Sequence, residues 1–168
     1  MIRRLIVFAA AAAACLALAA ASVCVRGATL PAEHTAGGEA DVAAPPARVF
    51  ARIADPARYP AWRKDVVGVR IVAAGRWVEQ TSQGTLPYRF GKRLEPGTLE
   101  TIVDSTSLPF SGSWTFELRP IPGGTRVRIT ERGRIASLPL RALAPVFSPP
   151  DRTLRRYLAD LRASFASE

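Results

Sequence analysis

The chain has very few residues of the types that most catalytic and metal sites use. Among its 168 residues, Cys15 and Cys24 are the only cysteines, and His34 is the single histidine. Beyond residue 24 there is therefore no disulfide, no thiolate metal ligand and no cysteine nucleophile. One histidine on a segment predicted to be flexible excludes a Ser-His-Asp triad and a histidine-based metal site. The sequence predicts no metal and no cofactor.

Lysine is also scarce, and acidic residues are outnumbered. Lys64 and Lys92 are the only lysines among 23 basic residues. The chain has 14 acidic residues, so its formal net charge is +9. No glycine-rich phosphate loop precedes a helix, because Gly123-Gly124 falls between two predicted strands as a hairpin turn. With 48% apolar and 22% charged residues, the chain is neither disordered nor a polytopic membrane protein. Its length indicates one domain plus an appendage.

The appendage comprises residues 1–26. Arg3 and Arg4 precede an uncharged run of 21 residues, 5–25, which is long enough to cross a bilayer as a helix. Because these two arginines outnumber Arg26 beyond the run, the N-terminus is expected to stay cytoplasmic and the remainder to be exported. We expect a domain anchored in the inner membrane that faces the periplasm or extracytoplasmic space.

Two fates of this segment stay open. It is either an uncleaved signal anchor or a signal peptide cleaved after Ala19-Ala20-Ala21, which would give a secreted protein. Lipidation at Cys24 is a weaker alternative, since the bulky Val23 fits the lipid-attachment chemistry poorly.

The rest of the chain changes its periodicity twice. Small, polar residues at 27–37 are predicted to be a tether, and residues 38–168 to be the domain. A short strand over 39–43 and two small helices over 45–62 come first. From Val67 to Arg134 apolar and polar residues alternate, which predicts about six antiparallel strands with one dry face. A helix of about four turns then places five apolar residues on one face: Leu154, Tyr157, Leu158, Leu161 and Phe165.

Five stretches of this sequence, 44–50, 55–62, 110–116, 124–133 and 157–161, resemble START-like proteins. These form the SRPBCC superfamily, which includes members of the polyketide cyclase/dehydrase type. The resemblance implies an α+β helix-grip fold, in which a curved antiparallel sheet wraps around a long C-terminal helix, here with an N-terminal hydrophobic helix added. Because members carry lipids, bind hormones or close aromatic rings, the resemblance does not choose among these functions.

The cavity that this resemblance implies would be lined by aromatic side chains on the dry face or at its rim. Large aromatic area suits a flat or long hydrophobic ligand, whereas the alternative is that the same rings are simply core. By strand parity Glu131 shares that face. It would anchor a ligand hydroxyl or act as an acid/base, unless an arginine pairs with it or a bulge turns it outward. The candidate ligand-binding residues are Trp62, Trp77, Tyr88, Phe90, Trp114, Phe116 and Glu131.

The opposite face of the last strand carries four arginines, Arg126, Arg128, Arg132 and Arg134. They are either contacts for anionic lipid headgroups or simply a solvated face. Nucleic acid is not an expected partner, because the domain is predicted to be exported and its aromatic residues face the other way.

The sequence is compatible with three functions. The favoured one is binding of a hydrophobic small molecule, lipid- or polyketide-like, in an apolar cavity and without chemistry. The second is a polyketide cyclase/dehydratase-like enzyme that uses Glu131 as acid/base. The third is an envelope interaction domain that takes no ligand because its own side chains fill the cavity.

Overall fold

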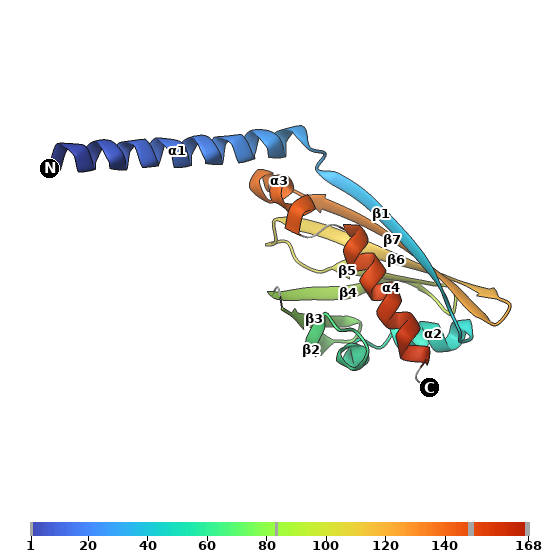
Figure 1. The fold of residues 1–168 in the computed structure, drawn as a ribbon. Helices are drawn as coiled ribbons and strands as arrows, with labels where there is room; N and C mark the ends of the chain where they lie inside the picture. The colour runs from blue at the N-terminus through green and yellow to red at the C-terminus, as the bar shows by residue number, and fades with distance from the viewer. Residues whose placement is uncertain (1, 83, 148–149, 167–168) are drawn as a thin grey trace.

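The computed structural model describes residues 2–82, 84–147 and 150–166. Within these residues, a helix lies at each end and seven strands lie between the first helix and the last (Figure 1). In chain order the elements are α1 (Ile2–Thr29), β1 (Glu33–Val42), α2 (Pro46–Ile53), the 3-10 helix η1 (Pro56–Ala61), β2 (Val66–Ala73), β3 (Arg76–Thr81), β4 (Gly84–Leu94), β5 (Thr98–Val103), β6 (Phe110–Ile121), β7 (Gly124–Ile135), α3 (Leu138–Phe147) and α4 (Pro150–Ala166).

The strands form one antiparallel sheet in the order β1-β7-β6-β5-β4-β3-β2. Figure 1 shows α4 lying across one face of the curved sheet, and we call this the inner face. Residues directly opposite each other on neighbouring strands share a face, so the pairs Trp114–Glu131 and Phe116–Ile129 place these side chains inward. This confirms the predicted alternation and the covering role of the last helix.

The core forms where α2 and α4 meet the inner face. The three apolar residues of α2, Val49, Phe50 and Ile53, are fully buried, as the short apolar stripe predicts. All five residues of the predicted apolar face of α4 are buried as well. Burial of apolar area from both helices is the main stabilisation of the fold.

The segment predicted as a tether is corrected by the structure. Residues 27–29 complete α1, and β1 begins at Glu33 rather than at residue 39. The inward residues of β1 include Ala36, Gly38 and Ala40, and a Cβ at Gly38 would come within 3.1 Å of the Leu158 side chain. Small residues at these positions let α4 approach the strand closely, so their size reflects packing and not flexibility.

The edge strand β2 differs from the expected alternation. Val67 is 74% exposed and Ile71 53% exposed, although both were assigned to the regular apolar alternation of the sheet. The pairing with β3 is irregular between Val66 and Gly68 and again between Ile71 and Ala73. These irregularities at an unpaired edge break the regular alternation of faces.

Helix α1 is joined to the domain at its C-terminal end. The segment Ala11–Thr29 has the length and the apolar composition that a membrane-spanning helix needs. Gly27 packs so closely on α3 that a Cβ there would overlap the Leu138 carbonyl group. The Arg141 guanidinium donates hydrogen bonds to the carbonyl oxygens of Gly27 and Leu30, at 3.4 and 3.3 Å, and of Ile135, at 2.8 Å.

Replacing Gly27 by valine is therefore expected to separate α1 from α3. Overpacking of this kind costs about 1–3 kcal/mol, which raises the local opening equilibrium roughly tenfold. Trypsin cleavage after Arg26, followed by mass spectrometry of the full chain in detergent, should accelerate by a similar factor. Ala28→Val is the matched control, because Ala28 is exposed on the same turn. Equal cleavage rates in the two variants would contradict the tight contact.

Candidate functional site

Aromatic rings fill the space between the inner face and α4, and Tyr157 is at their centre. Its ring centroid lies 5.3 Å from that of Trp62, 5.4 Å from that of Trp114 and 5.5 Å from that of Phe116. These rings come from α4, β6 and the residue after η1, so only the folded chain brings them together. Edge-to-face and tilted contacts at such distances stabilise a cluster beyond the burial of apolar area.

A second group of rings surrounds Trp77 on β3. Tyr88 stacks on it with centroids 5.7 Å apart, Phe90 lies at 4.6 Å and Tyr59 at 6.3 Å. All six aromatic residues that the sequence analysis selected thus lie in one connected cluster, which Tyr59 and Tyr157 complete. Tyr157 could have been selected too, because it lies on the apolar face of the last predicted helix.

An ionic cluster lies beneath these rings and was missed by the sequence analysis. Arg63, whose side chain is 10% exposed, donates to Asp65 Oδ2 at 2.7 Å and to Glu79 Oε2 at 3.0 Å. Trp77 Nε1 donates to the other Glu79 oxygen at 2.9 Å. The sequence did contain a signal for Glu79. It is two residues after Trp77 on the same strand and so faces the same side of the sheet, just as Glu131 does relative to Ile129.

The single cation of this cluster, Arg63, forms ion pairs with two carboxylates, those of Asp65 and Glu79. Burial raises the pKa of Glu79 above its ordinary value, although the charge of Arg63 and the Trp77 hydrogen bond act in the opposite direction. Burial disfavours the charge of Arg63, but Glu79 and Asp65 more than compensate and raise the pKa of the guanidinium. The guanidinium carbon also lies 5.0 Å from the Tyr59 ring centroid and 5.1 Å from that of Tyr157.

Three buried polar atoms in this region have no hydrogen-bond partner among the described residues: Trp62 Nε1, Tyr157 Oη and Glu131 Oε2. Burial raises the pKa of Tyr157, so its hydroxyl keeps its proton and can donate. The indole of Trp62 is a donor only, and a carboxylate oxygen is an acceptor. Two donors and one acceptor are therefore available to a ligand that reaches the cluster.

Glu131 faces inward, beside Trp114, as strand parity predicts. Its neighbour is His34, whose Nε2 lies 3.6 Å from Glu131 Oε1, and not an arginine. The imidazole lies over Gly133, where a Cβ would overlap it. Glu131 is 20% and His34 31% exposed, so the aromatic cluster is open to solvent at this end. The prediction that His34 lies on a flexible segment is corrected, because strand β1 holds it.

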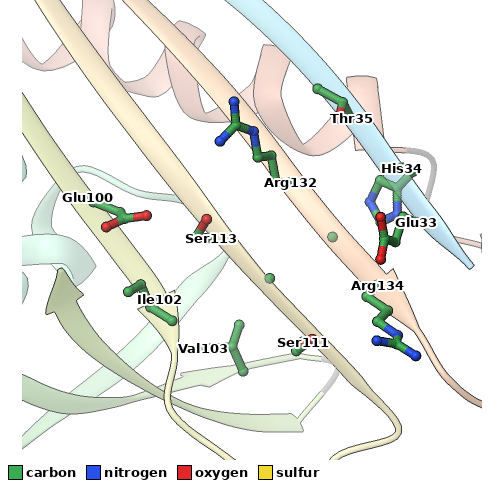
Figure 2. A pocket seen from close by; sticks show the side chains of 12 residues that line it. Glu33, His34, Thr35, Glu100, Ile102, Val103, Ser111, Ser113, Arg132 and Arg134 are labelled. Atoms are coloured by element: carbon green, nitrogen blue, oxygen red, sulfur yellow. The ribbon is translucent and has the colours of Figure 1, made fainter. Parts of the chain in front are cut away.

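Two surface hollows lie outside the aromatic cluster, although His34 lines the first and Trp62 the second. A groove of about 540 Å³ crosses the outer face over β1, β5, β6 and β7, where Figure 2 shows Arg132, Arg134, Ser111 and Ser113 along it. A second hollow of about 430 Å³ lies beside η1 and α4, and Trp62 is the one predicted ligand-binding residue in the lining of either. Within the described part of the chain, no three His, Cys, Asp or Glu side chains converge as a metal site requires.

The four arginines of β7 share the outer face but differ in their partners. Arg126 forms a two-bond ion pair with Asp41 at 2.8 and 2.9 Å, and this hydrogen-bonded partner lowers the pKa of Asp41. Arg128 lies 3.8 Å from Glu39. Arg132 and Arg134 have no acidic side chain within ion-pair distance in the described chain. Arg132 and Arg134 are thus the two of these four arginines that are available to an anionic partner.

Comparisons with known proteins agree with this architecture. The sequence profile of a family described as "Polyketide cyclase / dehydrase and lipid transport" matches residues 33–165. A START superfamily protein from Mycobacterium smegmatis has a similar structure, with a TM-score of 0.65 and 18% identity over 80% of this chain and 98% of that one. A norcoclaurine synthase point mutant from Thalictrum, in complex with a transition-state analogue, has a TM-score of 0.64 and 10% identity, over 80% of this chain and 95% of that one. No curated protein matches the sequence. At these identities the structural likeness shows the helix-grip fold alone.

Proposed function

Since this chain belongs to the polyketide cyclase/dehydrase and lipid transport family, within the SRPBCC superfamily, we propose that it binds a hydrophobic small molecule without chemistry. The observation that carries the proposal is the set of three buried, unpartnered polar atoms within a cluster of aromatic rings. Binding sites of this kind combine apolar walls with a few polar groups that fix orientation. A lipid-like or polyketide-like molecule has the matching composition.

Energetics support the same assignment. An unpartnered buried donor or acceptor costs about 1–3 kcal/mol, and a ligand oxygen or hydroxyl placed at Trp62, Tyr157 or Glu131 would remove part of this cost. The apolar body of the ligand would contribute roughly 25 cal/mol for each Å² that it buries against the rings. The residues proposed to contact it are those of the predicted set, Trp62, Trp77, Tyr88, Phe90, Trp114, Phe116 and Glu131, together with Tyr157.

The proposal includes a location at the membrane. The apolar run of α1 and the two arginines that precede it support an anchor with the domain outside the cytoplasm. A cleaved leader would give a secreted form of the same domain. Among the four outer arginines, Arg132 and Arg134 are those proposed to contact anionic headgroups, because Arg126 and Arg128 already face Asp41 and Glu39.

One contact favours an enzyme as the second candidate. His34 lies close enough to Glu131 for the two side chains to share a proton through a small adjustment. In a cyclase/dehydratase-like reaction, Glu131 would take a proton from a substrate carbon and return it to the hydroxyl that leaves as water, while His34 would orient the carboxylate. Both groups are at the open end of the aromatic cluster, where a substrate would enter.

Chemical identification of what co-purifies with the full chain tests the binding proposal. Native mass spectrometry and organic extraction are expected to show a bound hydrophobic molecule. Loss of a hydrogen bond to a charged group weakens binding roughly tenfold, so Glu131→Gln should lower occupancy by about this factor. Glu117→Gln is the matched control, because Glu117 lies on the outer face of β6. Repeatedly empty, folded preparations would contradict binding and favour the envelope interaction domain. Turnover that Glu131→Gln abolishes would favour the enzyme.

A further inference from the structure

Helix α3 presents an uncharged apolar surface to its surroundings. Its sequence, LPLRALAPVF, has one charged residue, Arg141, and the guanidinium of that residue is directed to backbone carbonyl oxygens of Ile135, Gly27 and Leu30. Leu138 is 37% and Leu143 42% exposed. A surface helix of a soluble domain ordinarily carries polar side chains opposite its buried face, and α3 carries none.

The position of α3 indicates what covers this surface. It packs against the last turns of α1, the helix that is able to cross a bilayer (Figure 1). Gly27 is in direct contact with Leu138 there. A bilayer crossed by α1 would end near Thr29, which is at the level of α3. The exposed leucines would therefore lie at the boundary between headgroups and acyl chains.

The charges around α3 are those that an anionic bilayer attracts. Arg132 and Arg134 precede the helix at the end of β7, on the outer-face groove that Figure 2 shows. Arg152, Arg155 and Arg156 follow it in the first turns of α4 and are all exposed. Glu33 and Glu100 line the same groove and Asp151 precedes the arginines of α4, whereas Glu131 of β7 faces inward and Asp160 of α4 is buried. Five exposed arginines thus face three acidic side chains there. Arginines close to an anionic membrane surface each strengthen binding to it.

We propose that α3 lies in the interfacial layer of an anionic phospholipid bilayer, with Leu138 and Leu143 in lipid and the neighbouring arginines on headgroups. This inference rests on the membrane anchoring in the proposed function and deepens it by naming the source of the ligand. Glu131 lies four residues before the end of β7, the strand that leads into α3. The open end of the aromatic cluster thus faces the bilayer, and the hydrophobic molecule enters from the membrane.

Spin labels in the reconstituted full chain test this contact. Labels are placed at Leu143→Cys and, as a matched exposed apolar control, at Val67→Cys on β2, each in a Cys15→Ser/Cys24→Ser background. Vesicles contain phosphatidylcholine and phosphatidylglycerol. We expect the Leu143 label to be relaxed preferentially by oxygen and the Val67 label by a water-soluble nickel complex. Equal behaviour of the two labels would overturn the proposal.

A third label separates this inference from the anchoring on which it depends. Leu16→Cys lies in the apolar part of α1 and should also be relaxed by oxygen. If Leu16 is in lipid and Leu143 is not, the inference fails and the anchor stands; if neither is, both fail. Extraction of a bound molecule from the same samples reports on ligand binding independently.

The headgroup contact has its own matched pair of variants. Arg132→Gln/Arg134→Gln should weaken the membrane contact of the Leu143 label roughly tenfold or more. Arg126→Gln/Arg128→Gln should leave it unchanged, because these arginines face Asp41 and Glu39. The same loss in both double variants, or in neither, would overturn the assignment of Arg132 and Arg134.

Discussion

Replacing Arg63 by methionine is expected to lower the free energy of unfolding by about 3–5 kcal/mol. The substitution replaces the apolar stem of the side chain but leaves the carboxylates of Glu79 and Asp65 without the cation that both contact. It also removes the cationic contact with the rings of Tyr59 and Tyr157. Urea unfolding followed by tryptophan fluorescence measures the loss within the domain alone, because all three tryptophans lie there.

Two further variants show whether the loss comes from unpaired buried charge. Adding Glu79→Gln to the methionine variant removes one of the carboxylates and should restore part of the stability. Arg128→Met removes an exposed arginine near Glu39 and should change the free energy of unfolding by less than about 1 kcal/mol. A loss at Arg63 no larger than that at Arg128 would contradict the structural role of the ionic cluster.

Tyr157→Ala is expected to destabilise the domain by about 3–5 kcal/mol, as truncation of a large buried aromatic residue does. Trp62, Trp114 and Phe116 each lose a ring contact, and α4 loses a contact with the inner face. The same urea titration measures this effect.

Tyr157→Phe separates the ring from its hydroxyl. The hydroxyl is buried and has no partner among the described residues, so its removal should leave the stability of the ligand-free protein unchanged or raise it. The amount of hydrophobic molecule retained on purification should nevertheless fall severalfold, since the ligand loses a donor. Lower stability of the ligand-free Phe variant, with full retention of the ligand, would show that the hydroxyl serves the core instead.

Much of this architecture follows from local pattern. A period of two between Val67 and Arg134 predicts the sheet and, correctly, the inward direction of Glu131. A helical period predicts which side of α4 is buried. These predictions succeed because side-chain direction along a strand or helix is fixed by backbone geometry, which depends only on neighbouring residues.

Partners across the fold do not follow from such patterns. Arg63 and Glu79 are 16 residues apart in the sequence. His34 contacts Glu131 only because the last strand, β7, pairs with the first strand, β1. The small residues of β1 resemble a flexible linker in sequence, yet they form a strand because they pair with β7 over the whole length of β1. Their lack of bulk then lets α4 pack closely on the strand. The local pattern of residues thus fixes which way a side chain points. Which residue it then contacts depends on pairings between distant segments, and no short stretch of sequence encodes such pairings.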